Sequence, residues 1–298
     1  MNILKQLIPG SIKTKVSHAR FWRERYNRRN ASVVASHGKR LDLCAAQFAH
    51  WLHISGNPPL QDKVCLELGT GWIATHALIA HLLGAKKVVT TDIEALIRPS
   101  FIGTAVREAV PSIVRDVLSP FERHDRIRRR LDRLRSIRTY TLEVLGELGV
   151  EYIAPIDLAK SRLNIPLDFV YSNSVLEHVP VDDVSSLLDN LTADLAPGGT
   201  MIHAIHLEDH RDIEHAPFLF LAESGREYDS LKQTEYGNRI RKSHWCKFFD
   251  HVEGLESRLI FEFTRPDKAL PPTVDSAISY VSEDDLRVSH VGVYGVKK

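Results

Sequence analysis

The chain has 298 residues, 39 Lys and Arg against 38 Asp and Glu, and 43 % hydrophobic residues. This composition excludes a disordered chain, a collagen-like repeat and a disulfide scaffold, and it suits one large or two smaller globular domains. The three cysteines lack metal-ligand or disulfide spacing, so we expect reduced thiols in a cytoplasmic protein. The apolar runs fall short of the roughly 18 residues of a membrane span, and the first one, interrupted by Lys5, is too short for a secretory signal.

Two basic segments contrast with an otherwise acidic chain. Residues 1–40 hold ten Lys and Arg and one acid, and residues 121–138 hold eight Arg and three acids. Such segments can attract phosphate, nucleic acid or an anionic membrane surface, although a solvated helix face has the same composition. Neither segment interleaves aromatic residues as single-strand binders do, which argues against nucleic acid as a partner. We expect a basic helical extension over residues 1–59, with peripheral membrane contact as its candidate role.

From residue 62 onwards, short β-branched runs alternate with helical periodicity. Helices are predicted at Trp72–Leu83, at about 182–195 and over 229–250. Strands are predicted at Lys63–Leu68, Lys87–Thr91, Glu151–Pro155, Asp168–Ser172, Thr200–His206, Arg258–Thr264 and His290–Val296. The alternation predicts an α/β fold over residues 60–298: a doubly wound, mostly parallel sheet with helices on both faces.

A separate long helix is predicted between the second and third strands. Ser119 can cap it, Pro120 suits its first turn, and Glu122 completes a capping box. Apolar or small residues then recur at a period near 3.6 until Gly149. We interpret residues 115–149 as a helical insertion that covers one side of the ligand crevice.

The strongest local signal lies where the first strand meets the first helix. Gly69 and Gly71 allow a tight turn and a close approach of the backbone to a ligand, and the helix start offers N–H groups. Asp92 ends the next strand, where an acid can accept hydrogen bonds from both ribose hydroxyls. These residues predict a site for a nucleoside-containing cofactor.

The pattern Gly69-Thr-Gly71-Trp-Ile-Ala74 also fits dinucleotide binding, which leaves a nicotinamide-dependent oxidoreductase as an alternative. Glu67 argues against it, because a carboxylate before the glycines would repel a pyrophosphate and suits an ammonium group. Two further segments follow in order: Asp168-Phe-Val-Tyr-Ser-Asn-Ser-Val-Leu-Glu-His178 at the fourth strand and Leu195-Ala-Pro-Gly-Gly199 before the fifth.

Taken in order, these segments over residues 62–206 resemble the class I S-adenosylmethionine-dependent methyltransferases. The resemblance implies a Rossmann-like, seven-stranded sheet whose last strand is antiparallel. It also implies S-adenosylmethionine as the cofactor, with Asp157 contacting the adenine amine. The chain departs from the family at Ile73, where a third glycine is often found. The predicted cofactor-binding residues are Glu67, Gly69, Thr70, Gly71, Asp92, Asp157 and Asn173.

Methyl transfer to a hydroxyl needs a base, and histidine has a suitable pKa. His178 follows the fourth strand, and His206 and His210 follow the fifth, so these three are the candidate catalytic residues. His203 alternates with His206 and should face away from it. A metal site built from His206, Asp209, His210 and His215 is disfavoured, because the spacing matches no recognised ligand geometry.

The acceptor is expected to be a small molecule. Arg239 and Arg241 could clamp a phosphate or carboxylate, or could form surface ion pairs. Residues 206–210 and 238–241 look similar to methyltransferases of surface-polysaccharide or small-metabolite pathways, which implies a sugar hydroxyl as one candidate. An RNA methyltransferase and a cofactor-binding subunit without catalysis remain alternatives, and the sequence leaves the oligomeric state open.

Overall fold

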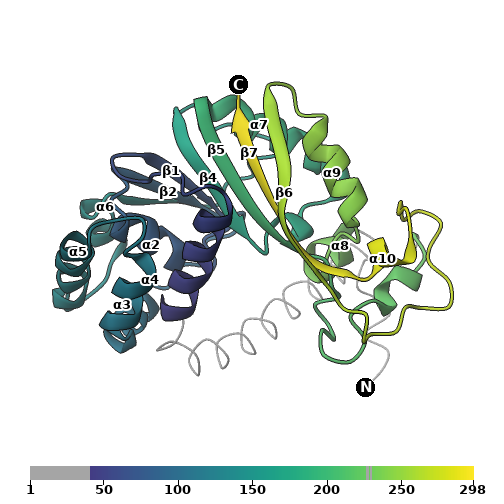
Figure 1. Cartoon of the computed structure of the whole chain (residues 1–298), viewed down its shortest axis with the longest axis horizontal. Coiled ribbons are helices and arrows are strands. Elements are labelled where there is room, and N and C mark those ends of the chain that lie inside the picture. Colours follow the sequence, from purple (N-terminus) through teal and green to yellow (C-terminus); the bar gives the residue numbers. More distant parts are fainter. Residues whose placement is uncertain (1–40, 226–227, 229) are drawn as a thin grey trace, which may run out of the picture.

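A computed structural model describes residues 41–225, 228 and 230–298. Its centre is a seven-stranded sheet in the order β3-β2-β1-β4-β5-β7-β6 (Figure 1). Strands β1 to β5 pair in parallel, and β7 pairs antiparallel with both β5 and β6. The sheet is therefore mixed at one edge, as expected for seven strands of which the last is antiparallel. The strands are β1 (Val64–Leu68), β2 (Lys87–Thr91), β3 (Val150–Ile153), β4 (Leu167–Asn173), β5 (Leu195–His206), β6 (Leu255–Thr264) and β7 (Val288–Lys297).

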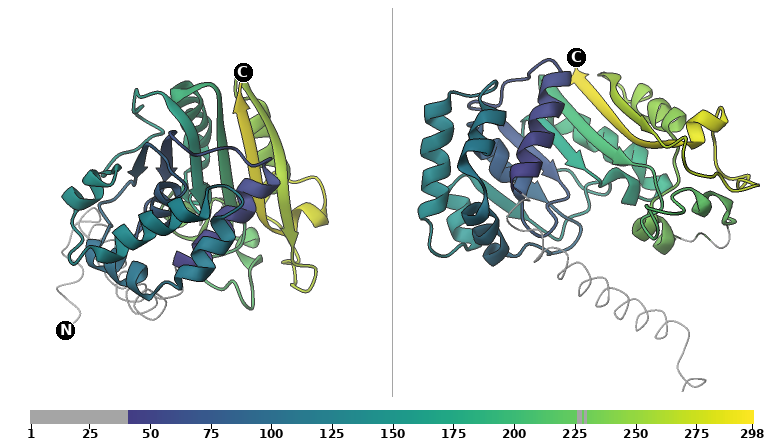
Figure 2. Two further views of the ribbon diagram at one scale, coloured as in Figure 1. Left: turned by 60° about the vertical axis from the view of Figure 1, so that its left-hand side comes forward. Right: turned by 60° about the horizontal axis from the view of Figure 1, so that its bottom comes forward.

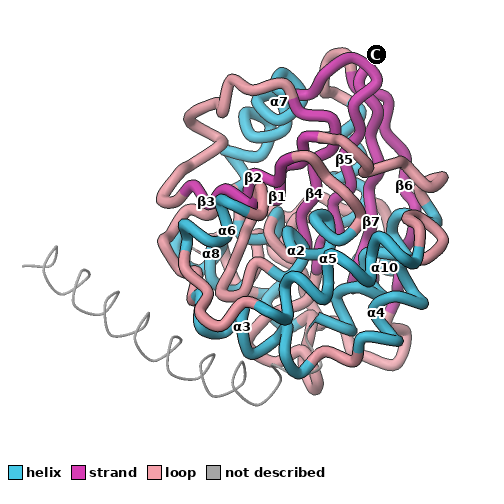
Figure 3. Tube along the Cα trace, turned by 90° about the vertical axis from the view of Figure 1, so that its left-hand side faces the viewer, coloured by secondary structure: helices cyan, strands magenta, loops and turns pink. Residues whose placement is uncertain are grey.

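Helices cover both faces of the sheet, and Figure 3 shows α7 on the opposite side from α2 to α5. The helices of the first half are α2 (Thr75–Leu82), α3 (Pro99–Glu108), α4 (Pro111–Leu118), α5 (His124–Ser136) and α6 (Leu142–Glu147). Those of the second half are α7 (Val184–Asp194), α8 (Ser230–Tyr236), α9 (Lys242–Asp250) and α10 (Glu283–Leu286), with short 3-10 turns η1 (Leu176–His178), η2 (Val181–Asp183) and η3 (Leu219–Ala222).

Strand alternation divides the core into two apolar clusters. Cys65 and Val88 pack with α2 to α6 on one face, whereas their chain neighbours Leu66 and Val89 pack with α7 and α9 on the other. Both sets are buried because the central strands carry apolar residues on both of their faces, as a sheet covered on both sides requires. The carboxyl ends of β1, β2, β4 and β5 thereby meet at one edge between the helical layers.

Of the predicted extension, the structure describes residues 41 onwards, and residues 1–40 lie outside the described part. Residues 41–54 form a helix whose Phe48 and Leu52 are buried in the same core as α2 (Figure 2). Its Gln47 reaches the end of β4, where its side-chain amide donates to Asn173 Oδ1 at 3.4 Å. This helix therefore belongs to the packing of the sheet domain and reaches the edge of the candidate site.

The predicted single helix from Ser119 to Gly149 is wrong, because the segment forms two helices, α5 and α6. Ser119 caps neither of them; its hydroxyl donates to Asp116 O at 2.8 Å. The break comes from Tyr140, whose hydroxyl donates to Leu134 O near the end of α5, and from Thr141, whose Oγ1 accepts from the backbone of α6 and starts a new helix.

The insertion also does not cover the crevice. On α5, Arg130 donates to Leu82 O at 2.9 Å and pairs with Glu122. Leu82 is the last residue of α2, whereas the crevice lies at the opposite, amino-terminal end of that helix. The segment packs behind α2 because its apolar stripe completes the first core cluster.

The predicted helix over 229–250 is likewise divided, into α8 and α9. Gly237 and Arg239 have φ values of +113° and +62°, which no right-handed helix accepts. Asn238 fixes this turn, since its Nδ2 donates to Leu176 O and Val179 O, both at 2.9 Å. The turn between α8 and α9 is therefore held by hydrogen bonds to η1 and the residue after it, beside the carboxyl end of β4. Within the described residues, no helix has the length and apolarity that crossing a bilayer would demand.

Candidate functional site

The loop of residues 69–74, called the glycine loop below, links β1 to α2. Gly69 and Gly71 have φ values of +81° and +61°. Gly69 N and Thr70 N both donate to Thr91 O at the end of β2, at 2.8 and 2.9 Å. A Cβ on Gly69 would lie 2.3 Å from Val175 Cγ2, so the segment after β4 leaves room only for glycine there. The loop is held between β2 and this segment.

Asp92 joins the second half of the glycine loop to β2. Its Oδ2 accepts from Gly71 N at 2.9 Å, and its Oδ1 accepts from Glu94 N at 3.2 Å. The structure thus places Gly71 and Asp92, 21 positions apart, in direct contact, because parallel pairing of β1 with β2 aligns their carboxyl ends. The carboxylate is partly buried and lies at the crevice edge.

Glu67 lies beneath the loop and is only 3 % exposed. Its Oε2 accepts from Thr90 Oγ1 at 2.5 Å, and Thr90 Oγ1 lies 2.6 Å from Thr70 Oγ1. Burial raises the pKa of Glu67 to about 8, so the buried carboxyl is mostly protonated at neutral pH. Its observed role is to support Thr70 from below, and a contact with a ligand ammonium stays a prediction.

Asp157 and Asn173 flank the crevice on either side. Asp157 Oδ1 accepts from Ala159 N at 3.0 Å, and its Oδ2 pairs with Lys160 at 2.8 Å. The residue before it donates to Asp92 O, which places this turn next to the ribose candidate. Asn173 ends β4 and is reached by Gln47 from the helix of residues 41–54. The structure therefore gathers both residues around the same edge of the sheet.

The surroundings of Gly71 and Asp92 offer open space and a carboxylate to an adenosyl amino acid. A Cβ on Gly71 would meet no atom of the described chain within 4 Å, so the space beside this glycine is open. A carboxylate able to accept from two hydroxyls stands directly next to it, at Asp92. An open glycine next to an acid gives space and an acceptor for a ribose and its attached chain, while the N–H groups of Gly69, Thr70 and Gly71 already donate to acceptors of this chain.

A second group of polar residues gathers beside the crevice, where β5 ends. Four imidazoles form a continuous row, called the histidine cluster below. The ring centroids of His178 and His210 are 4.7 Å apart, as are those of His210 and His206. His290 stacks on His206 at 4.2 Å. The structure thus brings the three predicted catalytic histidines together and adds a fourth.

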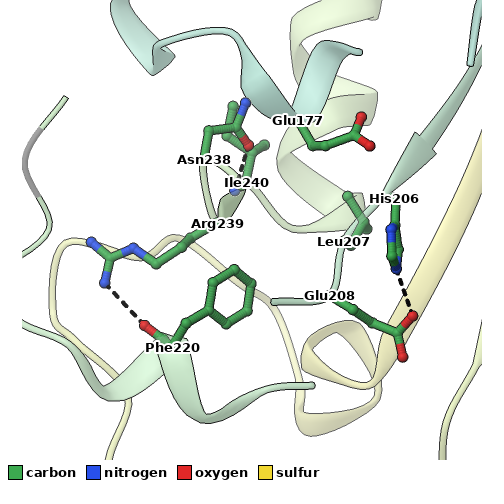
Figure 4. A pocket seen from close by; sticks show the side chains of 9 residues that line it. Glu177, His206, Leu207, Glu208, Phe220, Asn238, Arg239 and Ile240 are labelled. Atoms are coloured by element: carbon green, nitrogen blue, oxygen red, sulfur yellow. Dashed lines mark hydrogen bonds and ion pairs between the residues drawn. The ribbon is translucent and has the colours of Figure 1, made fainter. Parts of the chain in front are cut away.

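Two buried carboxyl groups accompany the histidine cluster. Glu208 Oε2 lies 2.7 Å from His206 Nε2, and its Oε1 accepts from Arg265 at 3.1 Å. Glu177 Oε1 lies 3.8 Å from His210 Nε2, and burial raises the pKa of Glu177 to about 8. Figure 4 shows Glu177 and His206 lining one small pocket, with Asn238 and Arg239 across from them. The base candidate His206 is therefore oriented by a carboxylate.

His203, Asp209 and His215 lie apart from this group. His203 is fully buried on the other face of β5, as alternation predicts, and its Nδ1 lies 2.8 Å from Ser172 Oγ. Asp209 pairs with Arg211, and the His215 side chain is 75 % exposed. The disfavoured set of His206, Asp209, His210 and His215 is therefore not assembled.

The two arginines considered as an anion clamp serve the fold instead. Arg241 is 0 % exposed and donates to the backbone oxygens of Leu207, Leu286 and Val288. Arg239 donates to Glu223 O at 2.5 Å and pairs with Asp275. The clamp interpretation is wrong because tertiary packing buries both guanidinium groups against acceptors of this chain.

Sequence reasoning missed His290, Glu208 and Gln47. His290 lies directly across from His206 in the antiparallel pairing of β5 with β7. His290 lies 84 positions after His206 in the sequence, so only the register of β5 with β7 brings it to the site. Glu208 stands two residues after His206 in a segment rich in His and acids, and this short spacing was the one local signal available.

Comparison with known proteins gives matches among solved structures only. No protein-family model matches the chain, and no curated protein matches it in sequence. A Mesorhizobium loti S-adenosylmethionine-dependent methyltransferase is 17 % identical, with 84 % of this chain and 98 % of that chain covered and a TM-score of 0.46. A Listeria monocytogenes protein, provisionally of the same class, is 12 % identical, with 85 % and 99 % covered and a TM-score of 0.43.

A third similar structure is the CurJ carbon methyltransferase, 12 % identical, with 82 % of this chain and 50 % of that chain covered and a TM-score of 0.40. These TM-scores lie below 0.5, so the fold is assigned from the sheet itself. Its order is β3-β2-β1-β4-β5-β7-β6, and β7 is antiparallel to both of its neighbours. The sheet thus has the seven strands and the antiparallel last strand that the sequence resemblance implies.

The departure from the expected glycine pattern at Ile73 has a structural reason. Ile73 is 7 % exposed and packs in the core beneath the loop, and the next residue, Ala74, takes a left-handed φ of +51° just before α2. The loop therefore makes its third left-handed turn at an alanine and needs no glycine at position 73.

Proposed function

We propose that the chain is an S-adenosylmethionine-dependent methyltransferase that methylates a hydroxyl group of a small molecule. The observation that carries this proposal is the contact of Gly71 N with Asp92 Oδ2 beside open space at Gly71. Asp92 would accept hydrogen bonds from the ribose hydroxyls, and the open side of Gly71 would admit the attached amino-acid chain. When bound, S-adenosylmethionine supplies an electrophilic methyl group on a sulfonium sulfur.

The histidine cluster supplies the base. Glu208 is paired with Arg265, so it accepts from His206 Nε2–H, and the lone pair of the neutral imidazole then lies on Nδ1. Glu208 holds the ring in one tautomer and stabilises the imidazolium that forms when His206 removes the acceptor's proton. His206 is 8 % exposed, so bulk water competes little for this position.

The spacing of the two parts suits methyl transfer. The glycine loop follows the carboxyl end of β1. In the sheet, β4 lies between β1 and β5. Two strand spacings separate β1 from β5, or about 10 Å. A cofactor in the crevice and an acceptor beside His206 would therefore meet over the end of β4. Alignment of donor and acceptor over this strand supplies much of the rate.

Calorimetric titration with S-adenosylhomocysteine tests the cofactor site. We expect binding by the full chain and a loss of affinity of about 10-fold to 100-fold in Asp92→Asn, because a hydrogen bond to a charged group is lost. Asp168→Asn is the matched control: Asp168 also accepts from a backbone amide, Val64 N at 2.8 Å, but at the amino end of β4. Absence of binding by the unaltered chain would contradict the proposal.

A further inference from the structure

Glu177 is a buried carboxyl group whose oxygens lack ordinary partners. The residue is 1 % exposed, and neither Oε1 nor Oε2 makes a hydrogen bond of ordinary geometry with the residues that the structure describes. Its own backbone, the backbone of His206 and the side chain of Ser174 lie close to it without such a bond. A carboxyl group buried in this way destabilises the fold unless something satisfies it. Its closest charged contact is His210 Nε2, 3.8 Å from Oε1, which is too far for a hydrogen bond.

Glu177, His178 and His210 converge on one point. Each offers one ligand atom, and these three atoms all lie within 4.8 Å of one another. Two atoms bound tetrahedrally to one Zn²⁺ are about 3.3 Å apart, so the observed 3.8 Å between Glu177 and His210 is close to the required separation. The distance between Glu177 Oε1 and His210 Nε2 is too long for a hydrogen bond, but it suits two ligands of one bridging metal ion.

His178 contacts a backbone carbonyl through its Nδ1 atom, as metal-bound histidines often do. His178 Nδ1 lies 2.7 Å from Thr234 O in α8, and a carbonyl oxygen can only accept. Nδ1 therefore carries the proton, and the lone pair of the neutral ring lies on Nε2. A backbone carbonyl that fixes the tautomer and orientation of an imidazole is the usual second contact of a metal ligand.

The neighbouring set of His206, Glu208 and His290 also has metal-ligand geometry, but its bonds are already made. Glu208 accepts from His206 at 2.7 Å and from Arg265 at 3.1 Å, so both of its oxygens are engaged. A cation there would have to displace an arginine. The observations therefore favour the set around Glu177.

We propose that Glu177, His178 and His210 form a binding site for one first-row divalent metal ion, with Zn²⁺ as the best-suited probe. Two imidazoles and one carboxylate suit Zn²⁺, Mn²⁺ or Fe²⁺ better than Mg²⁺ or Ca²⁺, which prefer oxygen ligands. Three protein ligands leave a fourth position for water or a substrate atom. This site goes beyond the proposed methyl transfer and does not depend on it.

The test is calorimetric titration of the chelator-stripped full chain with Zn²⁺, with Mg²⁺ as a comparison. We expect one Zn²⁺ per chain, much weaker Mg²⁺ binding, and a loss of Zn²⁺ affinity of about 100-fold or more in Glu177→Gln and in His210→Gln. His290→Gln and the exposed His215→Gln serve as matched controls and should keep the affinity within about 3-fold. Circular dichroism and thermal melting of the metal-free variants verify that each is folded.

Three results would overturn the proposal: no stoichiometric Zn²⁺ binding, equal binding in Glu177→Gln, or loss of binding in His290→Gln instead. The first means that water satisfies Glu177, and the third assigns the ion to the set around Glu208. If a variant fails to fold, Co²⁺ added to the unaltered chain decides, because tetrahedral imidazole ligation gives visible absorption much stronger than that of hydrated Co²⁺. S-adenosylhomocysteine binding is measured separately on stripped chain, so failure of the metal site and failure of the cofactor site are distinguishable.

Discussion

The glycine loop follows β1 and the histidine cluster lies where β5 ends, two strands away, and the polar groups of the two regions are satisfied differently. In the loop, Gly69 N, Thr70 N and Gly71 N all have acceptors from β2 or Asp92. In the cluster, Glu177 remains without a hydrogen bond from the described residues. Hydrogen bonds within the chain thus fix the conformation of the loop, whereas the cluster contains the carboxyl group of Glu177, which we propose binds a metal ion. In the two proposals, cofactor recognition therefore lies at β1 and β2, and the base and the metal ligands lie after β4 and β5.

The largest expected effect is on the histidine side. His206→Gln should lower the turnover number by roughly 10²-fold to 10⁴-fold, the usual contribution of a general base, and leave the affinity for S-adenosylhomocysteine unchanged. Turnover is followed as S-adenosylhomocysteine release with a panel of hydroxylated small molecules. His215→Gln is the control, since its exposed ring makes no contact with the cluster. Equal turnover in both variants would remove His206 from the mechanism.

On the loop side, two glycine substitutions should separate stability from binding. Gly69→Ala combines a left-handed φ with a clash against the stiff side chain of Val175, so unfolding free energy should fall by about 2 to 4 kcal/mol. Gly71→Ala has the left-handed φ without the clash and should cost only about 1 to 2 kcal/mol. Its Cβ would occupy the open space, so cofactor affinity should fall more than stability. Urea unfolding and calorimetry measure the two quantities, and the reverse pattern would mean that Gly71 does not face the ligand.

The smallest effect concerns the support beneath the loop. The pKa of Glu67 is raised to about 8 in the folded chain from 4.5, so the folded state holds a proton that the unfolded state releases between these values. Stability from this group is therefore complete below about pH 4.5 and is lost as pH rises towards 8. Glu67→Gln should flatten the fall in unfolding free energy between pH 5 and 8, by at most a few kcal/mol.

Urea unfolding at several pH values measures this slope. Glu214→Gln is the matched control because that side chain is 86 % exposed. If Glu67→Gln and Glu214→Gln have the same pH dependence as the unaltered chain, Glu67 is not the buried titrating group beneath the loop.

Much of the fold could be predicted because its signals are local. Every predicted strand has a counterpart in the sheet, and the antiparallel seventh strand follows the resemblance. The junction of Gly71 with Asp92 was also predictable, since parallel neighbours must bring their ends together. The break between α5 and α6 could not be predicted, because the helical periodicity of apolar residues continues through Tyr140 and Thr141 and is the same for one long helix as for two short ones. The break depends on which carbonyl and hydroxyl groups packing brings within reach.

The sequence by itself determined the order of strands and helices and the glycine turn, because these follow from periodicity and from backbone angles that few residues adopt. Only the tertiary structure decided which charged groups were buried. From the sequence, Arg241 was a candidate to bind an anionic ligand, but in the structure it is fully buried and donates to backbone oxygens of its own chain. Glu67 is buried beneath the glycine loop and is mostly protonated at neutral pH. Tertiary structure also brought His290 to His206 and Gln47 to Asn173. Burial and pairing of polar groups depend on distant parts of the chain, and so the chemistry of this site is fixed by packing.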